Sequence, residues 1–286
     1  MARQTKPLSA SCLKSLAKSP EHCWANHLDP DRVRTESEAM QLGSLIHCMV
    51  LEPKVVDERY AMIPEGMIKR GAKWNAWVEE TGSERSYVKS ATWKKAEDAV
   101  NRIKKDEVAG MLLNGRKRSI EKETLFQWSE RHVFGPDFNQ QSMAGFVNRV
   151  SMNGYIDLVN HQTKRIVDIK TTGNADDLSR LAKDGRWDLQ AVQYINAMNS
   201  YSRDTLGYRE EYKMFFLVVE TNSPYRIRAV ELSREALRNG TLDRNRLVEE
   251  FMQRLESGNW SGNSGLSSVD MPVWFSRNLE DLNEQC

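Results

Sequence analysis

"GYIDLVNHQTKRIVDIKTTG", residues 154–173, places two aspartates and a lysine inside two runs of apolar and β-branched residues. Such runs, separated by the polar segment HQTK at 161–164, predict two antiparallel strands joined by a short loop. If that segment is the loop, Asn160 faces Arg165 and the register of the whole hairpin follows. The charged side chains then have to be explained, because a buried strand seldom carries them.

This register places Asp157 opposite Asp168, and side chains of facing residues share one side of a sheet. The two-residue period of a strand adds Lys170 to that side. The apolar side chains expected on the opposite side are Ile156, Val167 and Ile169. Two carboxylates so close raise each other's pKa unless a cation neutralises them, and carboxylate oxygens suit Mg²⁺, with Mn²⁺ as a substitute.

A metal held by the two aspartates could activate water and stabilise charge on a phosphodiester, with Lys170 positioning the water or balancing the phosphate. The alternative is structural: Lys170 bridges Asp157 and Asp168 as an ion pair near a sheet edge. An isolated Asp-x-Lys after a strand favours that alternative, because such tripeptides are common. The hairpin therefore has to be weighed together with the rest of the chain.

The composition limits the classes of protein. The 286 residues carry 41 Lys and Arg against 40 Asp and Glu, a formal charge of +1, so no overall field indicates a polyanionic partner. The four cysteines show no CxxC pair, and no run of about 18 apolar residues occurs. We expect a cytoplasmic protein with reduced thiols and no contact with a membrane.

The first 120 residues are expected to be mainly helical. Ser9 or Ser11 can cap a helix that stops before Pro20, and Thr35 forms a capping box with Glu38. The second helix carries an apolar stripe, with His47 beside it. The stripe consists of Leu42, Leu45, Ile46, Met49 and Val50. Residues 66–108 are also expected to be helical. Their tryptophans, Trp74, Trp77 and Trp93, are expected to be core residues rather than platforms for base stacking.

From residue 121 the pattern becomes strand-like. Strands are predicted at TLFQW (124), GFVNRVSMNGYIDLVN (145), RIVDIKT (165) and YKMFFLVVE (212), with helices at 188–200 and 233–256. We predict an α/β (α+β) fold with a small mixed central sheet flanked by helices. The chain is taken as a single domain, 1–286, with its sheet core at 121–257. Residues 258–286 are expected to be an irregular tail held by Trp260, Pro272 and Trp274.

Four stretches in fixed order carry a resemblance to a known family. They are LSASCLKSLAKSPEHCWA (8–25), AMQLGSLIHCMVLEP (39–53), the GYIDLV…VDIKTT hairpin and LQAVQYINAM (189–198). Together they resemble the PD-(D/E)XK nuclease superfamily with its restriction-endonuclease-like core, and within it the RecE-like exodeoxyribonuclease VIII group of phages and prophages. The resemblance spans about residues 8–200.

The resemblance implies roles for individual residues. It makes Asp157 and Asp168 metal ligands, adds the main-chain carbonyl of Ile169, and makes Lys170 the catalytic lysine. His47 matches the histidine that joins the metal site in related RecB-type nucleases. The second acid is Asp168 where much of the superfamily has Glu, which leaves the chemistry intact and the finer metal geometry open.

The family pattern also implies an acid on the preceding strand and a Q-x-x-x-Y helix. Glu121 and Glu123 are both available, and Glu123 is preferred because it adjoins the run from Leu125. Gln190 and Tyr194 match the helix motif, and their i, i+4 spacing places both on one helix face. They are implied to contact substrate or to support the lysine.

The implied activity is a Mg²⁺-dependent exodeoxyribonuclease that degrades one strand of linear double-stranded DNA, 5′ to 3′, to leave single strand for homologous recombination in a bacterial host cell. The implied partners are DNA ends, a RecT-like single-strand annealing protein and further copies of the chain in a ring. Basic residues that could line the ring are Lys69, Arg70, Lys73, Arg116, Lys117 and Arg118.

Two other functions stay open. A catalytically silent DNA-binding or interaction module could keep the fold, although it would be expected to lack an acid or the lysine. A Cas4-like or structure-selective endonuclease is disfavoured by the absence of clustered cysteines.

Overall fold

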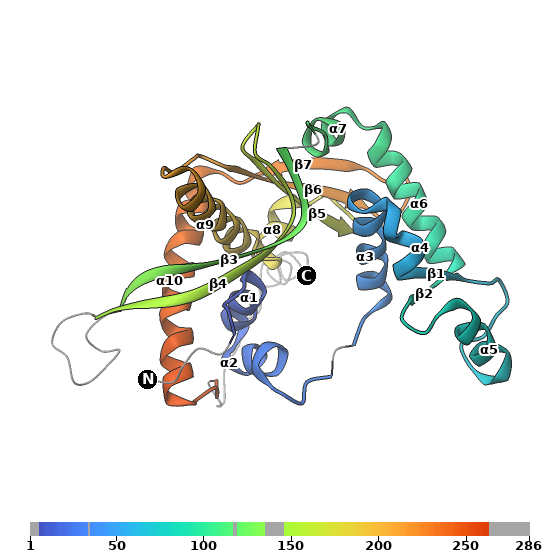
Figure 1. Ribbon diagram of the computed structural model, residues 1–286, viewed down its shortest axis with the longest axis horizontal. Coiled ribbons are helices and arrows are strands. Elements are labelled where there is room, and N and C mark those ends of the chain that lie inside the picture. The colour runs from blue at the N-terminus through green and yellow to red at the C-terminus, as the bar shows by residue number, and fades with distance from the viewer. Residues whose placement is uncertain (1–5, 34, 117–118, 135–145, 263–286) are drawn as a thin grey trace, which may run out of the picture.

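The computed structural model describes residues 6–33, 35–116, 119–134 and 146–262. Its centre is a five-stranded mixed sheet in the order β3-β4-β5-β6-β7 (Figure 1). The strands are β3 (Ile120–Phe134), β4 (Phe146–Asn160), β5 (Arg165–Thr172), β6 (Lys213–Glu220) and β7 (Ile227–Glu231). Only the β5–β6 pair is parallel. The predicted mixed sheet flanked by helices is confirmed.

Two hydrophobic clusters pack on the two faces of this sheet. The first joins the sheet to α1 (Ala10–Lys18), α9 (Trp187–Leu206) and α10 (Arg234–Ser257). The second joins it to α3 (Glu38–Leu51), α6 (Ser90–Lys105) and α7 (Glu107–Leu113). On β6, Phe216 and Val218 belong to the first cluster, while Leu217 and Val219 belong to the second. This alternation shows that β6 is buried on both faces.

The hairpin register is confirmed, but only as far as Leu158. The pairs Leu158–Val167, Val159–Ile166 and Asn160–Arg165 form the β4–β5 ladder. From Asp157 outward β4 leaves β5 and continues with β3 as a ribbon that extends beyond the sheet (Figure 1). On its other edge β4 makes an isolated parallel bridge between Met152 and Leu8.

The expectation that Ile156 shares a side with Val167 and Ile169 is wrong. All three side chains are buried, but Ile156 packs in the first cluster and the other two pack in the second. The reason is a break in the alternation within β4 at Asp157, since Leu158 packs in the second cluster whereas Ile156, two residues earlier, packs in the first.

The predicted N-cap residue is correct for α1 and wrong for α3. Ser9 caps α1 by accepting from the Cys12 N–H, and α1 ends at Lys18, before Pro20. The cap of α3 is Ser37 rather than Thr35, since the Ser37 hydroxyl accepts from Met40 N–H. Glu38 is therefore the first helical residue, where its negative charge favours the positive end of the helix dipole.

Residues 66–108 are not uniformly helical. Between α5 (Gly71–Thr81) and α6 the chain forms β2 (Ser86–Lys89), which pairs in parallel with β1 (Tyr60–Ile63). Both strands are four residues long, too short for a two-residue period to stand out. Trp74 and Trp77 pack on Tyr87 at ring-centroid distances of 5.2 Å but are half-buried and belong to neither cluster, whereas Trp93 packs against the second cluster.

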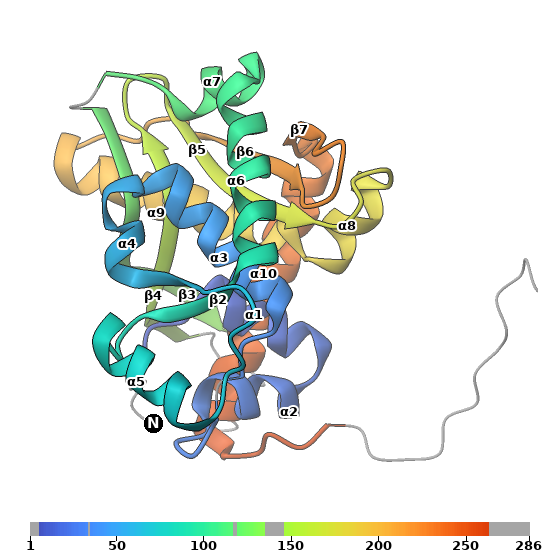
Figure 2. The same ribbon diagram turned by 90° about the vertical axis from the view of Figure 1, so that its right-hand side faces the viewer.

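The remaining elements are short. They are α2 (Pro20–Cys23), a π-helical turn (Trp24–Leu28), a 3₁₀ turn (Pro53–Val55), α4 (Val56–Arg59) and α8 (Leu178–Asp184). Figure 2 shows α3 and α6 in front of the sheet and α5 set apart below them. Across the described residues, no helix combines the length and apolarity needed to cross a membrane.

The chain after α10 agrees with prediction as far as it is described. The helix ends at Ser257, and Gly258 takes a left-handed conformation with φ of +70°. Trp260 is buried against Phe251 and Trp24. Pro272 and Trp274 lie outside the described residues.

A buried ionic network fixes the β3–β4 ribbon to the helices. The Arg244 side chain, which is 1% exposed, donates to Glu130 on β3 at 2.9 Å and to Gln193 on α9 at 2.6 Å. Burial by itself would raise the pKa of Glu130, but hydrogen bonds from His132 and Arg244 lower it to about 2. The ionised carboxylate therefore stabilises the fold.

This network makes stability depend on pH. Since the folded-state pKa of Glu130 lies below its unfolded value of 4.5, its contribution is present above pH 4.5 and is lost as the pH falls toward 2. We expect this contribution to be up to about 3 kcal/mol. Urea unfolding followed by tryptophan fluorescence should show Glu130→Gln less stable than wild type at pH 6, with the gap closing toward pH 2. A gap that does not vary with pH would contradict this.

Candidate metal centre

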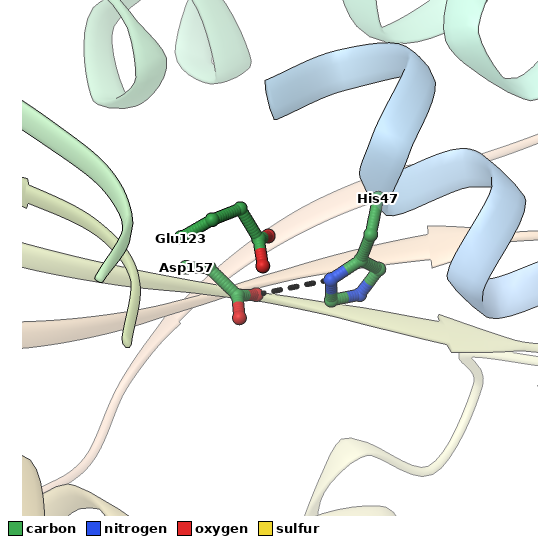
Figure 3. A group of neighbouring side chains, drawn as sticks. All are labelled: His47, Glu123 and Asp157. Carbon is green, nitrogen blue, oxygen red and sulfur yellow. Dashed lines mark ion pairs between the residues drawn. The ribbon is translucent and has the colours of Figure 1, made fainter. Parts of the chain in front are cut away.

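Three side chains from three elements converge at the point where β4 leaves β5. His47 on α3, Glu123 on β3 and Asp157 on β4 each offer a ligand atom, and these atoms lie within 4.8 Å of one another (Figure 3). All three were predicted from the sequence. Asp168, the other predicted acidic ligand, lies outside this group.

Asp157 holds the strands together where the ladder stops. Its Oδ2 accepts the Ile169 N–H at 2.7 Å and lies 3.3 Å from Nδ1 of His47. Burial raises the pKa of Asp157 well above its usual range, and the neighbouring Asp168 raises it further. A carboxylate so placed favours a bound cation. Asp157→Ala would leave the buried Ile169 N–H without an acceptor, so Asp157→Asn is the better test.

Glu123 lies at a distortion in β3. Lys122–Leu158 and Thr124–Ile156 are paired, but Glu123 has a left-handed backbone with φ of +48°. Such a conformation is costly for a residue with a side chain and is often found at functional sites. Its Oε1 is buried without a hydrogen-bond partner among the described residues. Burial raises the pKa of Glu123, as does nearby Glu52.

The positions of Glu121 and Glu123 in the structure show which of these two acids adjoins Asp157. Glu121, two residues earlier on β3, lies 3.2 Å from Nε2 of His161 and so belongs to a different contact. Glu123 is the acid beside Asp157.

His47 is placed by the close approach of α3 to β5. A Cβ atom on Gly43, one turn earlier, would lie 2.9 Å from Oγ1 of Thr171. Glycine at this position therefore allows the helix to approach. Burial lowers the pKa of His47, which favours the neutral imidazole that binds metals.

Lys170, Asp168 and Gln190 form a second group beside the first. Lys170 Nζ lies 2.6 Å from Asp168 Oδ2 and donates to Gln190 Oε1 at 3.0 Å. Gln190 Nε2 donates to Asp168 Oδ1 at 2.5 Å. The Tyr194 hydroxyl accepts from Gln190 Nε2 at 3.1 Å and donates to the Tyr155 carbonyl at 2.6 Å. Lys170 pairs with Asp168 alone instead of bridging both aspartates, and the Q-x-x-x-Y residues support this pair.

Lys14 was not predicted and belongs to the second group. Its Nζ donates to Gln190 Oε1 at 2.7 Å, beside Lys170. Burial lowers the pKa of Lys14 to about 7, and the charge of Lys170 contributes. No sequence signal identifies it, because a lysine on an amphipathic helix is ordinarily solvent-exposed.

Two cavities adjoin the site. One, of about 510 Å³, is lined by the metal-binding group together with Lys170, Tyr155 and Arg59. The other, of about 330 Å³, lies along α1 and is lined by Lys14, Lys170 and Tyr155. The predicted DNA-contacting residues line neither of them. Lys69, Arg70, Lys73 and Arg116 are exposed, and Lys117 and Arg118 lie outside the described residues.

The donor set fits a divalent metal. Two carboxylates suit Mg²⁺ or Mn²⁺, and the imidazole favours Mn²⁺ of these two. The buried, unpartnered oxygen of Glu123 gives independent support, since a bound cation would supply its missing partner. The residues that would hold the metal are His47, Glu123 and Asp157. The Ile169 carbonyl, beside the His47 ring, stays a predicted ligand.

Comparison with known proteins agrees with the predicted fold. The chain belongs to the PD-(D/E)XK nuclease superfamily. Within it, residues 9–132 and 139–269 match the family described as "PDDEXK-like domain of unknown function (DUF3799)", and this chain is a member of that family. No curated protein matches the chain.

Two solved structures match the chain at low sequence identity. One, described as a "Putative exonuclease" from Eubacterium rectale, matches with a TM-score of 0.59 and 14% identity, over 94% of this chain and 92% of that chain. Another, SSO0001, has a TM-score of 0.30 and 13% identity over 74% of this chain and 85% of that chain. The first likeness supports the fold alone.

Metal binding can be measured directly. We expect wild type to bind Mn²⁺ in isothermal titration calorimetry, and Asp157→Asn or Glu123→Gln to weaken this affinity by about 10-fold or more. Glu121→Gln is the matched control, being a carboxylate on the same strand outside the group, and should bind as wild type does. Equal losses at positions 121 and 123 would contradict the assignment.

The approach of α3 can be tested separately. Gly43→Ala should lower the unfolding temperature and weaken Mn²⁺ binding, because the new methyl group pushes His47 away at a cost of about 1–3 kcal/mol. Adding Thr171→Ala should restore both. Gly110→Ala is the control, since its Cβ would lie an ordinary 3.7 Å from Asn114. No rescue by Thr171→Ala would refute the contact as the cause.

Proposed function

We propose that this protein is a metal-dependent deoxyribonuclease. The observation that carries the proposal is the convergence of His47, Glu123 and Asp157 beside the Lys170–Asp168 pair. Metal-ligating and cationic groups that meet at one edge suit phosphodiester hydrolysis. A bound divalent metal would supply an activated water and stabilise charge on the phosphate.

The chain's own residues have separable tasks in this proposal. Glu123, Asp157 and the neutral His47 would hold the metal. Asp168 holds Lys170 at the edge of the site, and Gln190 holds both of them, so the ammonium group is fixed before a phosphate arrives. A preoriented cation next to developing negative charge is an effective source of rate acceleration.

We further propose the RecE-like activity: Mg²⁺-dependent removal of one strand from linear double-stranded DNA, 5′ to 3′, to provide single strand for recombination. Support comes from the ordered sequence stretches and from the fold shared with a structure described as an exonuclease. A cytoplasmic ring of several copies working with a RecT-like annealing protein belongs to the same proposal.

The alternatives are less well supported. A silent module would not need the complete set of acids and lysine. A Cas4-like enzyme needs clustered cysteines. Here Cys12 and Cys23 lie in the first hydrophobic cluster with their sulfurs 3.2 Å apart, while Cys48 packs in the second. Among the described residues, no three cysteines meet.

Digestion of linear duplex DNA labelled at the 5′ or 3′ ends, with closed circular DNA alongside, tests this function. We expect Mg²⁺- or Mn²⁺-dependent early loss of the 5′ label, with circles intact and no reaction in EDTA. Mn²⁺ should act at lower concentration than Mg²⁺, because the imidazole is a better ligand for it.

Lys170→Met should reduce the rate by about 100-fold or more. It should do so without loss of Mn²⁺ binding, while Glu121→Gln cleaves at the wild-type rate. Cleavage of no substrate by wild type would favour the silent module. Nicking of circles would favour the endonuclease.

A further inference from the structure

The β3–β4 ribbon leaves one of its two faces uncovered. Its even-numbered side chains turn toward α9 and the first hydrophobic cluster. Those buried there are Phe126, Trp128, Val150, Met152 and Ile156. Odd-numbered side chains point to the opposite face, because side chains alternate along a strand. Tyr155, on this face, lines the same cavity as Glu123 and Asp157, so the uncovered face leads to the metal centre.

Four successive cross-strand pairs lie along this face beyond the metal centre. They are Leu125–Tyr155, Gln127–Asn153, Ser129–Ser151 and Arg131–Arg149. Seven of these eight residues are exposed, and Asn153 is half-buried. The face thus changes from apolar to amide, hydroxyl and guanidinium groups. From Asp157 to Arg149 the distance along β4 is about 27 Å at about 3.4 Å per residue.

The near end of this face adjoins the site. Leu125 and Tyr155 are 52% and 50% exposed, and both line the cavity beside Lys14. Tyr155 also lines the metal cavity. Exposed aromatic rings beside a cationic groove are a usual platform for nucleotides. The neighbouring Asn153 Oδ1 is buried without a hydrogen-bond partner among the described residues, so an acceptor for a ligand is present there.

The far end concentrates positive charge. Arg131 and Arg149 face each other across the ribbon, and like charges in that arrangement destabilise a sheet. Both also border a cavity of about 560 Å³ that lies between the ribbon and α9, together with Arg203 of α9 and Arg209. Two acidic residues, Asp204 and Glu130, line the same cavity.

One of those two acids is already engaged. Glu130 accepts from the buried Arg244 at 2.9 Å and from the Trp128 indole at 2.6 Å. The cavity therefore has an excess of cations among its lining residues, which favours an anion.

We propose that the odd-numbered face of the ribbon is a track for the backbone of one DNA strand, with Leu125 and Tyr155 against a nucleotide beside the metal centre and Arg131 and Arg149 binding phosphates at the far end. This rests on the proposed function, because it needs DNA at the metal centre. At about 3.4 Å per nucleotide the track spans about eight base pairs of duplex.

The continuity of the track favours DNA over an acidic peptide. The two acidic residues of the metal centre, Glu123 and Asp157, belong to the same two strands as the arginine pair, so their separation is fixed by the sheet. Arginine forks match phosphate oxygens, and the amide and hydroxyl pairs between the two ends can contact a polar backbone without a charge requirement.

The test compares DNA binding by wild type and the double variant Arg131→Gln, Arg149→Gln, measured by fluorescence anisotropy in EDTA so that no hydrolysis occurs. The probes are a duplex of about 24 base pairs and a hairpin with a stem of about 6, which is shorter than the track. The ratio of the affinity for the longer duplex to that for the short hairpin is the length advantage, and we expect it to fall by about 10-fold in the variant. The slope of log affinity against log salt should decrease in magnitude by about 2.

Arg180→Gln is the matched control, since its side chain on α8 is 77% exposed and lies away from the ribbon. It should keep the wild-type length advantage and salt slope. Arg131→Gln alone provides a second variant if the double variant unfolds, and thermal unfolding reports this.

An unchanged length advantage in the arginine variants, or equal loss for both DNAs, would overturn the track, as would absence of DNA binding by wild type. The outcome is separable from that of the proposed function. If the arginine variants lose the length advantage but wild type hydrolyses no DNA, the track is kept and the nuclease function is rejected. If wild type hydrolyses DNA but the arginine variants keep the length advantage, the nuclease function is kept and the track is rejected.

Discussion

The hydrogen bond from the Ile169 N–H to the Asp157 carboxylate is the constraint on which the site depends. It replaces the next rung of the β4–β5 ladder, so β4 can leave β5 without exposing an unpaired amide in the core. The separation lets β4 continue with β3 as a ribbon and brings Glu123 beside Asp157. The same carboxylate contacts His47, so one group joins the sheet to α3.

The charged groups at this edge divide into two sets with different partners. His47, Glu123 and Asp157 face one another, and among the described residues neither acid forms an ion pair with a lysine or arginine, whereas Asp168 pairs with Lys170. Gln190 fixes the second set. Since its Oε1 accepts from both Lys14 and Lys170, its amide nitrogen must point to Asp168. A buried amide with both ends engaged holds its neighbours in one geometry.

Much of this could be predicted from the sequence, because alternation and a short polar loop determine the hairpin register. The predictions failed where a local pattern ended. Ile156 was assigned to the wrong side because no sequence signal marks the point where β4 leaves β5. Lys14 was missed because its burial depends on the packing of α1 against α9, which is far away in the sequence. Glu123 and Glu121 share strand parity, so only the left-handed backbone at Glu123 distinguishes them.

Ile169 gives the site an unusual dynamic character. Its amide bonds to Asp157 while its side chain, 1% exposed, packs in the second hydrophobic cluster. Exchange of this amide hydrogen with solvent therefore requires the carboxylate to release it and β5 to separate from α3. Sites built on mobile loops open locally, with little effect on the rest of a protein. Here the amide belongs to a strand packed into the core, so we expect it to exchange slowly.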